Sequence, residues 1–134
     1  MPTIDWHVRA FTRNIPLDVQ FQSDLPEDFR LPLHTELALY RVVQEALTNI
    51  ARHSGAAQAS IRLQSRDGLL KLIIRDDGRG FDVGAVMNSD ERGLGLHGIQ
   101  ERVELIGGKL TLESAEGRGT RLCVEVPVLE KVNG

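Results

Sequence analysis

The stretch QASIRLQSRDGLLKLIIRDDGRG, residues 58–80, contains two runs in which apolar and polar side chains alternate. A period of two is typical of a β-strand with one buried face, and the short RDG segment between the runs predicts a hairpin. In the second run Leu70, Leu72 and Ile74 share one face, and Asp76 continues that face. The hairpin is therefore predicted to present an apolar surface that ends in a carboxylate.

Asp76 lies on the apolar face of the hairpin, and another layer of the protein must cover this face. A buried carboxylate requires hydrogen-bond donors. Gly78 and Gly80 follow it without side chains, so a flat heterocycle could enter and donate an exocyclic amino hydrogen to Asp76. A tight turn after a strand explains the D-x-G-x-G spacing at least as often, and both interpretations stay open at this point.

The rest of the chain alternates between helical and strand patterns. Leu39, Val43 and Ile50 recur on one face of the longest helical pattern, and Ile99 and Val103 do so in a second one. In chain order we predict a helix at 4–14, a strand at 17–23, a helix at 34–53, strands at 58–65 and 69–76, a loop at 81–92, a helix at 96–106, and strands at 109–114 and 120–128. Hairpins dominate, and each amphipathic helix has one face to bury. We expect an α+β fold, a two-layer sandwich whose mixed, largely antiparallel sheet has helices packed on one face.

Composition narrows the classes of function. The chain has 134 residues, the length of one domain, with a formal net charge of −3 and a pI of about 5.8. This balance argues against direct nucleic-acid binding, so a phosphate-bearing ligand must be held by local donors. Cys123 is the single cysteine, which excludes an intrachain disulfide. No apolar run approaches the roughly 18–20 residues of a membrane span. We expect a soluble, cytoplasmic domain, with membrane attachment of a longer parent left open.

The predicted helix at 34–53 carries polar side chains beside its apolar face. Glu45, Asn49 and Arg52 fall within a narrow arc at 3.6 residues per turn, and His53 lies near its edge. A carboxylate and a carboxamide oxygen one turn apart suit Mg²⁺, and an arginine on the next turn adds a donor for phosphate. A solvated helix edge is the alternative explanation of this pattern.

A third cluster, RGLGLHGI, opens the helix predicted at 96–106. Gly93, Gly95 and Gly98 let backbone N–H groups approach an anion, and a helix N-terminus favours negative charge. The P-loop pattern is absent, and no strand leads directly into the cluster as a dinucleotide fingerprint requires. A flexible loop before a helix is the alternative. The three clusters together predict a nucleotide site, with residues 81–92 as its lid.

These motifs resemble the ATP-binding catalytic domain of two-component sensor histidine kinases, in the ATPase superfamily shared with gyrase, Hsp90 and MutL. EALTNIARHSGA resembles that family's N box, DDGRGFD its first glycine box, GLGLHGIQERVELIGGKLTLES its second, and EGRGT its closing segment. The resemblance covers residues 37–127 and implies the Bergerat ATP-binding fold. The segments RHSGA and GIQERVELIGG are similar to those of the subfamily whose partners are response regulators with LuxR-type DNA-binding domains.

The resemblance also implies roles for individual residues. Asn49 would ligate Mg²⁺, and Glu45 would order the water shell of the metal. Asp76 would accept a hydrogen bond from the adenine amino group of ATP. The remaining implied contacts are Arg52 and His53 beside the phosphates, Gly78 and Gly80 at the adenine floor, the backbone of Gly93, Leu94, Gly95 and Leu96 around the phosphates, and Thr120 near adenine.

The family's phosphoacceptor histidine lies on a separate helical dimerisation domain, which this chain lacks. We therefore expect residues 1–15 to be the tail of that domain or a linker, and residues 16–134 to be the ATP-binding domain. The domain would be a monomer with little transfer activity in isolation, and its parent a homodimeric protein-histidine kinase. The lid is short, as in the LuxR-linked subfamily. The alternatives are an anti-sigma-factor serine kinase, a hydrolytic ATPase like gyrase, and a degenerate nucleotide-binding interaction module.

Overall fold

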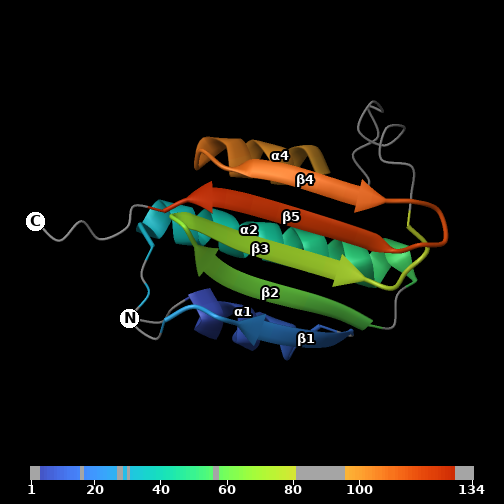
Figure 1. Ribbon diagram of the computed structural model, residues 1–134. Coiled ribbons are helices and arrows are strands. Elements are labelled where there is room, and N and C mark those ends of the chain that lie inside the picture. The colour runs from blue at the N-terminus through green and yellow to red at the C-terminus, as the bar shows by residue number, and fades with distance from the viewer. Residues whose placement is uncertain are drawn as a thin grey trace, which may run out of the picture.

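The computed structural model describes residues 4–15, 17–26, 29, 31–55, 58–80 and 96–128 (Figure 1). In chain order its elements are α1 (Ile4–Thr12), β1 (Asp18–Ser23), α2 (Leu33–Asn49), the π-helical turn η1 (Ile50–Ser54), β2 (Gln58–Arg66), β3 (Leu69–Asp76), α4 (Leu96–Leu105), β4 (Lys109–Ser114) and β5 (Thr120–Pro127). The predicted lid at 81–92 lies outside the described residues. Among the helices described, none combines the length and apolarity needed to cross a bilayer.

The five strands form one sheet in the order β1-β2-β3-β5-β4. β1 pairs with β2 in parallel, and the other three pairs are antiparallel, so the predicted mixed, largely antiparallel sheet is confirmed. The predicted hairpin is β2–β3, in which Arg66 faces Leu69 across a two-residue turn. Asp67 and Gly68 both have positive φ, the geometry of a turn that matches strand twist.

The core lies between the sheet and the helices. α1, α2 and α4 cover the same face of the sheet, and no described helix lies on the other face, called the open face below (Figure 1). The buried side chains of β2 and β3 alternate with half-buried or exposed ones, as the sequence predicted. The largest fully buried side chains are Leu39, Leu47, Ile61, Leu63, Leu70, Leu72, Ile74, Ile99, Val8, Val42, Val43 and Val103.

The C-terminal end of the long helix differs from the prediction of one continuous helix at 34–53. α2 ends at Asn49, and a π-helical turn runs on to Ser54 before Gly55 stops it with φ 68°. Glycine adopts this left-handed conformation without steric cost. A π-helical turn has more residues per turn than an α-helix, so the angle between Arg52 and Glu45 differs from the one that 3.6 residues per turn predicts.

α1 packs on this domain, although the assignment of residues 1–15 to a preceding domain stays a prediction. Ile4 and Val8 are buried in the common core. The His7 ring lies against the ring of Tyr40 at a centroid distance of 5.4 Å. Trp6 on the same helix is 58% exposed.

Replacing Val8 with Ala is expected to lower the free energy of unfolding by about 2 kcal/mol, because it removes two methyl groups from a fully buried site. Trp6→Ala on the exposed side of α1 is the matched control, with an expected loss under about 0.5 kcal/mol. Urea denaturation of both variants measures the difference. Equal losses would mean that α1 does not pack on this core in solution.

Candidate nucleotide-binding site

A row of polar side chains closes one end of the apolar core. Asp76 on β3 lies opposite Thr120 on β5, which in turn lies opposite Ser114 on β4. Residues opposite each other in a sheet point to the same face, here the helix-covered face that holds Ile74. The hydroxyl oxygens of Ser114 and Thr120 are 2.9 Å apart, and the Ser114 hydroxyl is also 2.9 Å from the Gly119 carbonyl that accepts its hydrogen bond.

The Asp76 carboxylate is half-buried and fixed in orientation. The Gly78 backbone N–H donates to its Oδ1 at 2.7 Å. Burial raises the pKa of Asp76, and the neighbouring charge of Asp77 raises it further, while the hydrogen bond from Gly78 opposes both. The described residues make no hydrogen bond to Oδ2, which leaves an acceptor beside Thr120.

Two glycines allow the chain after β3 to touch the β4–β5 turn. Gly80 has φ 66°, and a Cβ there would collide with the carbonyl oxygen of Ala115. Gly119 has φ 72°, and its Cβ would collide with the carbonyl oxygen of Asp76. The sequence suggested that Gly80 clears space for a ligand. In the structure the Ala115 peptide occupies the space beside Gly80. The missing side chain therefore allows the backbone after Asp76 to pack against the β4–β5 turn.

A second group of side chains lies between α2 and α4. Arg102 on α4 places Nε and Nη2 each 3.2 Å from Oε1 of Glu45 on α2. Oε2 of Glu45 is buried and has no hydrogen-bond partner among the described residues. A Cβ on Gly98 would lie 3.4 Å from this oxygen, so the first turns of α4 cover the carboxylate closely.

The other predicted site residues are placed as follows. Asn49 is the last residue of α2, one turn beyond Glu45, as the spacing predicted. Arg52 is exposed on the π-helical turn, whose backbone also includes His53. Leu96 begins α4. The side chains of His53 and Leu96 lie outside the described residues, as do Gly93, Leu94 and Gly95.

Comparison with known proteins identifies the family. The model for histidine kinase-, DNA gyrase B-, and HSP90-like ATPases matches residues 34–130, most of the chain. The chain belongs to this ATPase family. Membership implies that the domain binds ATP, as the sequence predicted. The Glu45–Asn49 pair, Asp76 and Thr120 all lie within the matched residues.

The ATPase domain is similar to those of sensor histidine kinases. It is 30% identical to the signal transduction histidine-protein kinase/phosphatase DegS of Brevibacillus brevis, over 96% of this chain and 32% of that protein. It is 34% identical to the sensor histidine kinase LiaS of Bacillus subtilis (strain 168), over 92% of this chain and 33% of that protein. The chain thus spans about a third of the length of these relatives.

Solved structures confirm the fold of the ATPase domain. The catalytic domain of histidine kinase ThkA superposes with a TM-score of 0.72 at 20% sequence identity, over 92% of this chain and 88% of that chain. The predicted two-layer α+β sandwich is therefore correct. Pairing with a LuxR-type response regulator and the oligomeric state of the parent stay predictions.

Two residues of the site were missed by sequence reasoning. Ser114 ends the KLTLES run on the face of Leu110 and Leu112, in the way Asp76 ends its own strand, so the alternation could have indicated it. Arg102 carried no such signal, because a charged residue on an amphipathic helix ordinarily faces solvent. Its partner lies 57 residues away in the sequence.

A hollow of about 430 Å³ opens beside the polar row, at the ends of β3, β4 and β5. Asp76, Ser114 and Thr120 contribute to its wall together with Arg118 and Gly119 of the β4–β5 turn. Its lining among the described residues includes no side chain of α2. Arg75, Glu113 and Arg121, whose register positions face the other side of the sheet, also line it, so the hollow lies at the edge of the sheet and is not confined to the helix-covered face.

Proposed function

We propose that the domain binds ATP with Mg²⁺ and donates the γ-phosphoryl group to a histidine on a separate helical dimerisation domain of its parent kinase. The observation that carries the proposal is the placement of Asp76. It is a half-buried carboxylate, held by the Gly78 N–H at 2.7 Å, on the helix-covered face beside Thr120. Its remaining oxygen is an acceptor to which the adenine amino group would donate.

Asp76 would also select adenine over guanine. Guanine presents a carbonyl oxygen where adenine presents its amino group, and two facing acceptors disfavour binding. Thr120 would approach the base from the neighbouring strand, and its contact with Ser114 at 2.9 Å fixes the hydroxyl. Gly78 and Gly80 would shape the floor of the adenine site through their backbone.

Glu45 and Asn49 fit a Mg²⁺ site. The buried Oε2 of Glu45 has no partner among the described residues, and such an acceptor suits the hydrogens of metal-bound water. Mg²⁺ is commonly bound by one or two protein oxygens together with substrate phosphates and water, so the Asn49 carboxamide would act as the direct ligand. When bound, the metal supplies charge neutralisation at the phosphates.

The phosphates would lie between the π-helical turn and the start of α4. Arg52 would contribute its guanidinium and His53 its imidazole, and the backbone of Gly93, Leu94, Gly95 and Leu96 would donate N–H groups. A helix N-terminus attracts anions because its first N–H groups lack partners within the helix. Residues 81–92 would close over the nucleotide as a lid.

Phosphoryl transfer depends mainly on positioning and electrostatic stabilisation. An imidazole nitrogen on the partner domain would bond to the γ-phosphorus as the bond to the bridging oxygen of ADP breaks. The phosphoryl group would then pass to an aspartate of a response regulator with a LuxR-type DNA-binding domain. The parent would be a homodimer, and residues 1–15 would lead from its helical domain. The histidine kinase names of the relatives support the kinase part of this proposal.

Calorimetric titration of the chain with ATP and GTP, each with Mg²⁺ and with a chelator, tests the proposal. ATP is expected to bind at least about tenfold more tightly than GTP, and Mg²⁺ to strengthen ATP binding. Asn49→Ala should remove the effect of the metal and leave metal-free binding largely intact. Equal affinity for ATP and GTP would contradict the role of Asp76, and absence of ATP binding at millimolar concentration would contradict the proposal.

A further inference from the structure

The contact between Arg102 and Glu45 joins the two helices that flank the proposed metal site. Both Nε and Nη2 of Arg102 lie 3.2 Å from the same oxygen, Oε1. The hydrogen bond from Nε and the ion-pair contact of Nη2 converge on one oxygen, and rotation of the carboxylate about its last bond would break both. The arginine thereby also determines the position of the other oxygen.

That other oxygen, Oε2, is in an unusual state. It is buried, it makes no hydrogen bond within the described part of the chain, and Gly98 of α4 lies beside it. Buried polar atoms in folded proteins are nearly always hydrogen-bonded, so an unpaired one needs an explanation. Arg102 could satisfy both oxygens of Glu45 in a fork-to-fork arrangement, but in this structure it uses only one.

We propose that Arg102 is a positioning residue, which holds Glu45 by Oε1 so that Oε2 is kept for the water shell of Mg²⁺. The inference rests on the proposed function and adds a residue to it. Arg102 also ties α2, which carries Glu45 and Asn49, to α4, which follows the predicted phosphate loop. The helix that carries the proposed metal ligands and the helix that follows the predicted phosphate loop are thus joined by one side chain.

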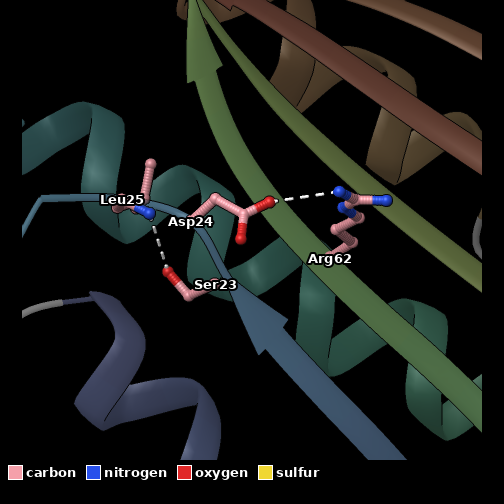
Figure 2. Close-up of polar contacts among 4 residues, drawn as sticks. All are labelled: Ser23, Asp24, Leu25 and Arg62. Carbon is pink, nitrogen blue, oxygen red and sulfur yellow. Dashed lines mark hydrogen bonds and ion pairs between the residues drawn. The ribbon is translucent and has the colours of Figure 1, made fainter.

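A purely structural ion pair between the helices is the competing explanation, and the molecule contains a matched example. Arg62 on β2 lies 3.2 Å from Asp24, and their side chains are 51% and 46% exposed (Figure 2). Arg102 and Glu45 have the same separation, with exposures of 41% and 33%. Arg62 lies between the buried Ile61 and Leu63, so it projects from the open face of the sheet, away from the site.

The test compares Arg102→Gln, Glu45→Gln, the double variant and Arg62→Gln. For each, calorimetry gives the dissociation constant for ATP with and without Mg²⁺, and thermal unfolding gives stability. Arg102→Gln is expected to reduce the Mg²⁺ effect on ATP affinity about tenfold, the usual range for residues that orient metal-site groups. Metal-free ATP binding should change less than about twofold, because adenine recognition at Asp76 is separate.

The double variant should lose no more of the Mg²⁺ effect than the stronger single variant, because both changes disrupt the same contact between Arg102 and Glu45. Arg102→Lys should restore part of the effect, because an ammonium can still donate to Oε1 but lacks the fork geometry. Arg62→Gln should leave the effect unchanged. Arg102→Lys also serves as the test variant if Arg102→Gln does not fold.

Three results would overturn the positioning role: an unchanged Mg²⁺ effect in the Arg102 variants, an equal loss of metal-free binding, or additive losses in the double variant. Each of these leaves the proposed function standing if the wild-type chain binds ATP more tightly with Mg²⁺. A wild-type chain that binds ATP with no Mg²⁺ effect would instead overturn the metal part of the proposed function, and the role of Arg102 with it.

Discussion

Replacing Asp76 with Asn is expected to weaken ATP binding about 100-fold while leaving the ligand-free domain at least as stable as the wild type. The Asn carboxamide oxygen can still accept the Gly78 N–H that now lies 2.7 Å from Oδ1, so the local backbone is retained. Its NH₂ group then faces the adenine amino group, and two opposed donors cost a few kcal/mol, which corresponds to about 100-fold. Calorimetry with ATP measures the loss.

The stability half of this prediction follows from the pKa of Asp76. Burial raises that pKa above the ordinary value of 3.8, so the folded state binds the proton more tightly than the unfolded state. Stability therefore rises as pH falls through the folded pKa, and the cost of the buried charge is fully present at neutral pH. Asn carries no charge and escapes this cost. Its advantage in thermal unfolding should shrink as pH falls toward 3.8.

Asp77→Asn is the matched control for the affinity measurement but not for the pH profile, because the Asp77 charge itself raises the pKa of Asp76. Asp77 is the adjacent carboxylate, is exposed, and accepts the Gln58 backbone N–H at 3.2 Å. It follows the last residue of β3 and has no register partner in the sheet. Equal loss of ATP affinity in the two variants would indicate a general charge effect, and wild-type affinity in Asp76→Asn would exclude Asp76 from the adenine site.

The sequence was sufficient to predict the β2–β3 hairpin and the position of Asp76 within it. Strand alternation has a fixed period, so once Leu72 and Ile74 are buried Asp76 must lie on the same face. The mixed, largely antiparallel sheet also followed from the hairpins. The order of the strands did not, because β5 lies between β3 and β4, and periodicity gives the faces of a strand but not its neighbours.

The parts of the site that sequence reasoning missed depend on contacts between distant elements. The π-helical turn shifts Arg52 relative to Glu45, and IARHS contains no proline or glycine to indicate it. The partner of Glu45 is fixed by how α4 packs on α2, which the pattern of either helix leaves open. Gly119 was noted only as part of a motif, and its approach to the Asp76 carbonyl requires the β4–β5 turn to be in place.

Gly119→Ala is expected to lower the free energy of unfolding by about 3 kcal/mol or more. The left-handed conformation at φ 72° costs a residue with a Cβ about 1–2 kcal/mol. The new methyl group would also collide with the carbonyl oxygen of Asp76, and such overpacking typically adds about 1–3 kcal/mol. Both colliding groups belong to paired strands or their ends, so a rotamer change cannot relieve the contact. Urea denaturation gives the value.

Gly117→Ala separates the two contributions, because Gly117 lies in the same turn with φ 78° and has no atom within 4 Å of an added Cβ. It should lose only the conformational part, so the two variants should differ by about 2 kcal/mol. Gly119→Ala should also weaken ATP binding, since relief of the collision moves the Asp76 peptide, whereas Gly117→Ala should bind ATP normally. Equal losses of stability would mean that the turn and the end of β3 do not make this contact in solution.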